Sequence, residues 1–373
     1  MRDAKTSSWI FDSHDPWNVP FRFPRRGYRL DGHECWRRRS SEADFDRLLG
    51  IIATAWTVPS YSLRHLPTLT MLDRSLKLVL TMMAVATTYA LAATTAPKKV
   101  VVSGAGGQTG QALFRKLLAL PDEFQPLGLV RSEESKKALV DSGVPEFNVI
   151  VADVTNADAV KAAVQIAGGD NLYGFCICTS AKPAPTEEIN PETGRPAFVF
   201  PRGDPEVVDW VGQKNQIDAC PPGAHVVLCS TMGGTNPDHP LNTIAKKINP
   251  DGSISGGMIV QWKRKSEVYL TEQAPKLKYT IVHPGGLTNE PGGQRELVVG
   301  VDDSMEGTES RTVPREDVAQ VMLEALRHPT QYAGRSFDVR AKDVGDGSPT
   351  KDFQTLLDRL EGKNCDYSLG ATM

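Results

Sequence analysis

A strand, a glycine-rich loop and a helix follow one another directly in residues 98–120, and this order constrains the fold most strongly. The β-branched run at residues 100–102 is long enough for a buried strand. Beyond the glycines, Leu113, Phe114, Leu117 and Leu118 recur at helical spacing. Glycines let the backbone approach a pyrophosphate, and the helix N-terminus offers free N–H groups and the positive end of its dipole. The sequence therefore predicts a nucleotide-phosphate site.

The predicted phosphate loop is made of consecutive small and polar residues: Gly104, Gly106, Gly107, Gln108, Thr109 and Gly110. Its spacing is Gly104-x-x-Gly107-x-x-Gly110, which differs from the G-x-G-x-x-G of ordinary dinucleotide folds. The alternative is a plain strand-to-helix turn. A strand before the loop and a helix after it favour nucleotide binding.

Strand and helix patterns alternate from residue 98 onward. Further strands are expected at residues 124–130, 147–151, 172–179, 225–229, 279–283 and 337–339. Helices are expected at 133–141, 157–167, 205–220, 257–272, 313–326 and 351–360. This alternation predicts an α/β fold with a doubly wound parallel sheet. Ligands bind beyond the carboxyl ends of such strands, where the strand order reverses.

The end of the second predicted strand indicates which dinucleotide binds. NAD-binding folds place an acid about 20 residues past the glycines to hold the ribose 2′-hydroxyl. Here Arg131 and Ser132 stand at that strand end instead. A guanidinium can grip a 2′-phosphate with two hydrogen bonds, so the sequence predicts NADP(H) over NAD(H). The alternative is a solvated surface arginine, and the nearby Glu133 and Glu134 keep NAD(H) open.

Composition excludes several classes of partner. A net charge of -3 gives no basis for binding nucleic acid or an anionic membrane surface. The six cysteines show no C-x-x-C pair and no Cys/His zinc spacing, so no metal site is expected. We expect buried free thiols, with Cys176 and Cys178 on the same face of one strand.

The N-terminal part divides at Met71. Residues 1–70 are rich in tryptophan and arginine and have poor apolar periodicity. This composition predicts either a poorly structured extension or a gene-model artefact, in which case the true start is Met71. Residues 71–97 resemble a signal peptide, with a basic start, an apolar middle and Ala90-x-Ala92. The alternatives are an uncleaved anchor at residues 74–92, which alone would give membrane contact, or a buried helix. This predicts the secretory route or a plastid, or the cytoplasm if the segment is unused. The folded domain is expected at residues 98–365.

Three stretches carry a family resemblance: residues 208–219, 230–242 and 262–267. Together with the glycine loop, they resemble the atypical, NmrA-like branch of the short-chain dehydrogenase/reductases, in a plant and algal group of stress-associated NAD(P)-binding proteins. The resemblance covers residues 98–360. It implies a Rossmann-like sheet with a small C-terminal lobe on the substrate side, and NADP(H) as cofactor.

The resemblance also implies cofactor contacts at later strand ends. Asp153 and Val154 occupy the position that meets adenine, although Asp153 could instead stabilise the next helix. Thr179 stands where the family runs past the cofactor ribose. Pro284, Gly285 and Gly286 occupy the turn beside the nicotinamide, where glycines would let backbone N–H groups approach.

Ordinary members of the superfamily reduce carbonyls with Ser, Tyr and Lys, the last two one helical turn apart. Ser230 and Thr231 offer the hydroxyl, and Thr231 aligns better. Lys265 matches the lysine, but Gln261 stands four residues before it and cannot act as an acid. Lys263 offers no better match, because Ile259 precedes it by four.

The proton donor is therefore missing from its usual place, and other candidates are Tyr173, Tyr269, His239, His283 or water. The proline-rich stretch 182–205 is expected to form a substrate lid. These features favour an NADP(H)-dependent oxidoreductase for a small carbonyl or quinone-like acceptor. A catalytically weak NADP(H) sensor is the alternative, and a scaffold without ligand fits the glycine loop poorly.

Overall fold

A computed structural model of the chain describes residues 96–189, 194 and 196–370. These residues belong to one compact unit, Ala84–Met373. The predictions for residues 1–70 and for the signal-like segment up to residue 95 lie outside the described residues. Within the described part, no helix is both long and apolar enough to span a bilayer.

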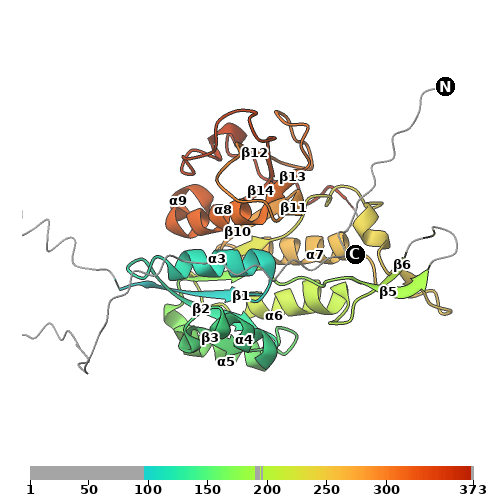
Figure 1. Cartoon of the computed structure of the whole chain (residues 1–373), viewed down its shortest axis with the longest axis horizontal. Coiled ribbons are helices and arrows are strands. Elements are labelled where there is room, and N and C mark those ends of the chain that lie inside the picture. The colour runs from blue at the N-terminus through green and yellow to red at the C-terminus, as the bar shows by residue number, and fades with distance from the viewer. Residues whose placement is uncertain (1–95, 190–193, 195, 371–373) are drawn as a thin grey trace, which may run out of the picture. The chain divides into compact units, whose positions relative to one another are not determined.

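The unit is built on an eight-stranded sheet with the order β12-β14-β10-β7-β4-β1-β2-β3 (Figure 1). Its strands are β1 (Lys98–Ser103), β2 (Phe124–Val130), β3 (Val149–Val151), β4 (Gly174–Ile177), β7 (His225–Cys229), β10 (Lys278–Pro284), β12 (Leu297–Gly300) and β14 (Arg335–Ala341). All neighbours are parallel except β12 and β14. The predicted doubly wound α/β fold is therefore confirmed.

Helices cover both faces of the sheet because alternate strand residues point to opposite faces. Val100 and Val102 pack on one face with α3 (Gln108–Leu118), α4 (Glu133–Asp141), α8 (Arg315–Arg327) and α9 (Pro329–Tyr332). Val101 packs on the other with α5 (Ala157–Ala167), α6 (Gln213–Asp218) and α7 (Ile259–Glu272). Cys176 and Cys178 both face the first layer, as predicted.

The strand order of the sheet reverses direction at one position. From β1 the chain continues to β2 and β3 on one side of the sheet, and then crosses to β4 on the other side. The carboxyl ends of β1 and β4 therefore form the topological switch point, where such sheets bind ligands. The loop between β1 and α3 lies at this point.

Several predicted elements differ from the structure. The helix expected at 205–220 is a π-helix, η3 (Glu206–Gly212), followed by α6. The expected lid contains an antiparallel pair, β5 (Ala184–Ile189) and β6 (Pro196–Val199). The third strand begins only after a 3-10 turn, η1 (Glu146–Asn148). Another 3-10 turn, η2 (Gly169–Asn171), precedes β4.

The terminal helix predicted at 351–360 is wrong, because only the 3-10 turn η5 (Asp358–Leu360) forms there. Asp352 explains part of the difference. Its side chain accepts hydrogen bonds from the backbone N–H of Gln354 and Thr355, at 2.9 and 3.3 Å. Such local bonds offer the backbone an alternative to a helix.

Small elements follow the carboxyl ends of β7 and β10. They are η4 (Pro240–Thr243), the antiparallel pair β8 (Lys247–Ile248) and β9 (Ile254–Ser255), and the parallel pair β11 (Gly286–Thr288) and β13 (Thr312–Pro314). Of these, η4, β8 and β9 lie between β7 and α7, and β11 follows β10 and pairs with β13. The substrate-side lobe that the family resemblance implies stays a prediction.

Candidate functional site

The glycine loop packs tightly against the end of β4. Gly104 adopts a φ of 67°, and a Cβ there would lie 2.8 Å from the carbonyl oxygen of Cys178. A Cβ on Gly110 would lie only 2.2 Å from the carbonyl oxygen of Gly104. Both positions exclude any larger residue, so the loop is fixed at the switch point by its own contacts.

The N-terminus of α3 is available to an anion. Gly107 is its N-cap residue, no described side chain caps this end, and the first turn contains no acid. Gly106 is exposed, and a Cβ on it would meet nothing closer than 3.5 Å. The protein itself therefore does not require glycine at this position. Unpaired N–H groups and the helix dipole can hold a pyrophosphate here, with Gln108 and Thr109 in the first turn.

Arg131 is exposed directly after β2 and donates a hydrogen bond to the carbonyl oxygen of Arg202. Ser132 is the N-cap of α4, where its hydroxyl accepts from the backbone N–H of Ser135 at 3.3 Å. The serine hydroxyl thus already has a role in the helix cap. Sequence reasoning missed Arg202, because only the folded β5–β6 segment returns it to Arg131.

The three residues expected near the adenosine follow β3 and β4, which lie on opposite sides of β1 in the sheet. Asp153 accepts from the backbone N–H and the hydroxyl of Thr155 at 2.9 and 2.8 Å, and Asn156 rather than Asp153 caps α5. Val154 is buried. Thr179 Oγ1 accepts from Gln216 Nε2 at 3.2 Å. All three follow strands on either side of the switch point.

The two hydroxyls after β7 differ in their surroundings. Ser230 is buried and donates to Glu267 Oε1. Thr231 is half-buried, donates to the carbonyl of Met232 at 3.1 Å, and lines a small polar pocket. Of the two hydroxyls, Thr231 alone lines this pocket.

The lysines of α7 point in different directions. Lys265 packs over the rings of Trp210 and Trp262, with Nζ 4.9 and 5.0 Å from their centroids. Lys263 is buried and pairs with Asp209, its Nζ 2.8 Å from Oδ1. Because the two lysines are two residues apart, they lie on different faces of the helix.

Of the two lysines, Lys263 is the one that lies toward the carboxyl ends of β4 and β7. Burial raises the pKa of the Cys229 thiol at the end of β7, and the Lys263 charge opposes that rise. The same charge acts on Cys178, just after β4, whose pKa burial also raises. Asp209, the ion-pair partner of Lys263, also accepts a hydrogen bond from the backbone N–H of Ala181 at 3.1 Å, so Lys263 lies near the segment that follows β4.

Two of the candidate proton donors lie away from this edge. Tyr173 precedes β4 and donates to the carbonyl of Leu326 at 2.8 Å, at the opposite end of the strand. Tyr269 donates to Asp218 on the outer face of α7 and α6. Neither is placed to protonate a substrate at the switch point.

The two histidines lie closer. His239 is half-buried in the loop after β7, and burial lowers its pKa. His283 ends β10, is buried, and lines the same pocket as Thr231. Burial would lower the pKa of His283, but Glu267 and other partners, including Asp338, raise it well above its usual value. The carboxylates around His283 therefore favour its protonated form.

A buried polar cluster surrounds His283. Its Nε2 lies 3.1 Å from Glu267 Oε2, and Arg264 lies 3.6 Å from the same carboxylate. Burial works to raise the pKa of Glu267, yet His283, Ser230 and Arg264 together lower it. The cluster is ionised and internally paired, which is the arrangement that makes buried charges tolerable.

The turn after β10 does not offer the free N–H groups that the sequence predicts. The Gly285 N–H donates to the carbonyl of Val339 at 2.9 Å, and that of Gly286 to the carbonyl of Arg311 at 2.8 Å. A Cβ on Gly285 would lie 2.6 Å from the Arg311 oxygen, so the glycine serves packing. In this structure both N–H groups therefore already have backbone partners, and a place for this turn beside the nicotinamide stays a prediction. Pro284 accepts at its carbonyl from Met232, 3.1 Å away.

Comparison with known proteins gives consistent results. A family model described as NAD(P)H-binding matches residues 104–329. An uncharacterised chloroplastic protein of Arabidopsis thaliana is 42% identical over 283 residues, covering 75% of this chain and 80% of that protein. Sanguinarine reductase of Eschscholzia californica is 38% identical over 282 residues, covering 70% and 95%.

Among solved structures, a short-chain dehydrogenase/reductase from Veillonella parvula in complex with NADP is 16% identical, with a TM-score of 0.43. The match covers 68% of this chain and 99% of that one. The family model and the two relatives span the glycine loop, the sheet and α7. The chain therefore belongs to the NAD(P)H-binding family.

Proposed function

We propose that the protein is an NADP(H)-dependent oxidoreductase acting on a small carbonyl or quinone-like acceptor. The observation that carries this is the uncapped N-terminus of α3 at the switch point, with exposed Arg131 at the next strand end. The helix end suits the pyrophosphate, and the guanidinium suits a 2′-phosphate. No acid stands at the end of β2 to favour a free 2′-hydroxyl.

The relatives support a reductase. The Eschscholzia protein is named for a reductase activity, and it matches this chain over 95% of its own length. Its named substrate belongs to that protein. What carries over in the proposal is the reaction class, a reduction.

Bound NADPH supplies the hydride, which is the difficult part of the reaction. The Thr231 hydroxyl can donate a hydrogen bond to the acceptor oxygen, where negative charge develops. We assign the ribose-binding lysine to Lys263 instead of Lys265, because Lys263 faces the strand ends. A quinone-like acceptor forms a stabilised anion, so it can take its proton from water after hydride transfer. This suits a helix that carries Ile259, and not tyrosine, four residues before Lys263.

A matched pair of lysine variants tests the assignment. Lys263→Met alone would leave Asp209 buried without its partner, which costs about 3–5 kcal/mol of stability. Lys263→Met should therefore be combined with Asp209→Asn and compared with Asp209→Asn alone. We expect kcat to fall by about tenfold or more in the double variant, since lost ionic hydrogen bonds are worth about 1.5–3 kcal/mol. Lys265→Met should keep wild-type turnover. Loss of turnover in Lys265→Met, with no further loss in the double variant, would return the assignment to Lys265.

The alternative is an NADP(H)-sensing protein with little turnover. The absence of tyrosine four residues before either Lys263 or Lys265, both in the described α7, favours it. Both functions predict tight NADPH binding. They differ in whether any acceptor makes the protein consume NADPH.

We also propose a plastid location. Two relatives with 42% and 30% identity are named chloroplastic, and the signal-like segment 71–97 could direct the chain there. A fluorescent fusion to the intact N-terminus should co-localise with chlorophyll. Retention of the fusion in the cytoplasm or along the secretory route would contradict this proposal.

A further inference from the structure

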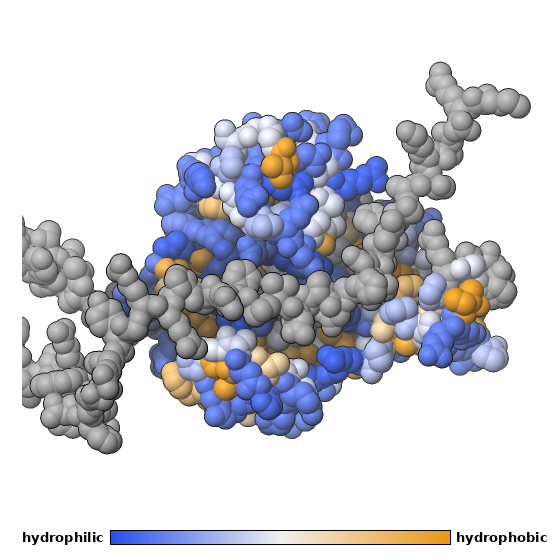
Figure 2. All heavy atoms as spheres, viewed as in Figure 1, coloured by the Kyte–Doolittle hydropathy of each residue, from blue (hydrophilic) through white to orange (hydrophobic). Residues whose placement is uncertain are grey.

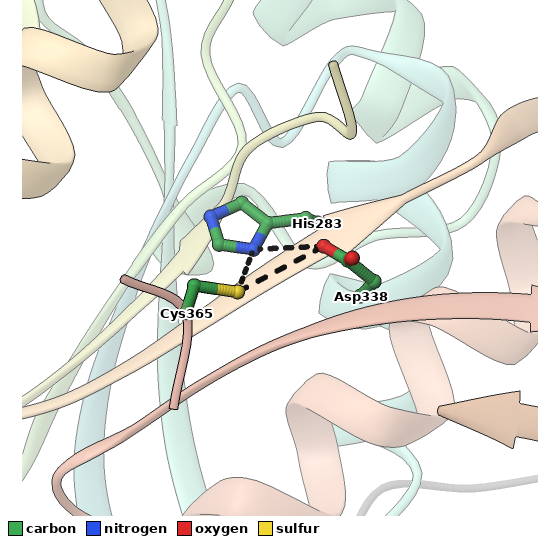
Figure 3. A group of neighbouring side chains, drawn as sticks. All are labelled: His283, Asp338 and Cys365. Carbon is green, nitrogen blue, oxygen red and sulfur yellow. Dashed lines mark hydrogen bonds and ion pairs between the residues drawn. The ribbon is translucent and has the colours of Figure 1, made fainter. Parts of the chain in front are cut away.

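We propose a zinc-binding site formed by His283 Nδ1, Asp338 Oδ1 and Cys365 Sγ (Figure 3). The three residues are all buried, and they come from the end of β10, from β14 and from the segment near the C-terminus. Figure 3 shows the three ligand atoms turned toward one another. Because the ligands lie far apart in the sequence, their spacing gives no zinc signature.

The distances between the ligand atoms fit a tetrahedral ion. Nδ1 of His283 lies 3.5 Å from the Cys365 sulfur and 3.4 Å from Oδ1 of Asp338. The sulfur and Oδ1 are 3.9 Å apart. Zinc bonds of about 2.3 Å to sulfur and about 2.0–2.1 Å to nitrogen or oxygen give tetrahedral edges of about 3.3–3.6 Å. A shift of a few tenths of an ångström in one side chain therefore completes the geometry.

The surroundings of the ligands also match a metal site. A histidine that binds zinc through one ring nitrogen almost always presents the other to a carboxylate. Here Nε2 of His283 lies 3.1 Å from Glu267 Oε2, and Ser230 and Arg264 hold that carboxylate in turn. The second oxygen of Asp338 accepts from the backbone N–H of Asp303 at 2.7 Å. Asp338 Oδ1 is thereby directed toward the histidine and the thiol.

The charges are balanced when zinc is present. A thiolate from Cys365 and the carboxylate of Asp338 together neutralise a divalent ion. The Glu267 carboxylate is compensated by Arg264, whose guanidinium also packs on the Tyr367 ring, 4.2 Å from its centroid. No uncompensated charge is then buried among these groups.

The three protein ligands leave a fourth position. His283, Asp338 and Cys365 line the polar pocket that also contains Thr231 and Thr235. Water from this pocket can supply the remaining ligand, as in zinc sites with three protein ligands. The ion would fasten the segment after β14 to the sheet, because Cys365 is the only one of the three ligands in that segment. This proposal does not depend on the proposed reductase activity.

Metal binding by the full chain tests the proposal. We expect about one zinc ion per chain to remain after dialysis, by elemental analysis. Cobalt chloride added to the metal-free protein should give tetrahedral d–d bands and a thiolate-to-cobalt charge-transfer band. Zinc should raise the Tm of the wild-type protein, since a ligand that binds only the native state stabilises it.

Cys365→Ser should lose the charge-transfer band and the zinc-dependent rise in Tm. Cys220→Ser is the matched control, because Cys220 is another buried free thiol, far from His283 in the sequence and bonded to the Gln216 carbonyl. This control should behave as wild type. If Cys365→Ser does not fold, Asp338→Asn provides the same comparison through its loss of zinc affinity.

Two results would overturn the proposal. One is a wild-type protein that keeps no zinc and shows no charge-transfer band with cobalt. The other is zinc retained equally by wild type, Cys365→Ser and Asp338→Asn, which would place the ion elsewhere. In either case the three residues form a hydrogen-bonded ion-pair cluster and nothing more.

Discussion

Two glycines in one loop have different reasons to be glycine. A Cβ on Gly110 would overlap the Gly104 oxygen at 2.2 Å, whereas a Cβ on Gly106 would fit among its protein neighbours. We therefore expect Gly110→Ala to destabilise the fold by about 1–3 kcal/mol or more. Gly106→Ala should keep the wild-type Tm and weaken NADPH by about tenfold or more, because the methyl group occupies space that the pyrophosphate needs.

Thermal unfolding and NADPH titration by fluorescence measure the two effects separately. The interpretation of the loop would fail if Gly106→Ala bound NADPH as tightly as wild type. It would also fail if Gly110→Ala were as stable as wild type.

Arg131 should decide the preference between NADPH and NADH. Its guanidinium is exposed at the end of β2 and can make charge-assisted hydrogen bonds to a 2′-phosphate. We expect Arg131→Ala to weaken NADPH by about 10- to 100-fold, which corresponds to about 1.5–3 kcal/mol. NADH affinity should change little. Arg115→Ala is the control, because Arg115 is also exposed and bonds only Ser142 among the described residues. An equal loss for both cofactors would contradict the 2′-phosphate assignment.

Residue roles were harder to predict than residue types. The sequence indicates a hydroxyl pair after β7 and a lysine on α7, and both exist at the expected elements. It could not distinguish Lys263 from Lys265, because the choice depends on Asp209 and Trp210 of η3, which lie more than 50 positions away. Spacing along one helix does not show what packs against each of its faces.

At the scale of elements, strong periodicity predicted the structure well. The helix at Glu133–Asp141 and the strand at His225–Cys229 have the predicted bounds, because a cap or a buried apolar run marks each of them. The π-helix η3 was missed because its apolar residues also fit an α-helix. The antiparallel pair β5–β6 was missed because its strands are short, largely exposed and each contain a proline.

The pairing of β7 with β10 predicts a pH dependence of stability. His225 is buried at the start of β7, and its Nε2 lies 2.8 Å from Thr280 Oγ1. Thr280 donates its own hydroxyl hydrogen to the Tyr332 carbonyl, so the neutral histidine must be the donor to Thr280. Burial, with a smaller effect of Lys278, lowers the pKa of His225 from 6.5 to about 4.

Between these two pH values, His225 is therefore protonated in the unfolded chain but neutral in the native state. The contribution of neutral His225 to the free energy of unfolding is complete above pH 6.5. It falls by about 3 kcal/mol in total as the pH drops toward 4. Urea unfolding across this range should show a steeper loss for wild type than for His225→Gln, which can still donate to Thr280. Parallel pH profiles for the two proteins would contradict the buried neutral state.

At the scale of the whole described unit, the sheet gathers residues from distant segments at one edge. The phosphate loop, Arg131, Thr231 and Lys263 all follow or face the carboxyl ends of its strands. The β5–β6 pair follows β4 and exposes Ile189 and Val199. Figure 2 shows hydrophobic surface at the end of the described unit where this pair lies. We expect this apolar pair to favour an apolar acceptor in the proposed reaction.

The most direct test of the central claim is NADPH oxidation by the purified full chain, followed by absorbance against a panel of quinones, aldehydes and ketones. We expect NADPH to be consumed only when an acceptor is present and fastest with quinone-like compounds, and we expect slower consumption of NADH. Tight NADPH binding without consumption across the whole panel would contradict the oxidoreductase and establish the cofactor-sensing alternative.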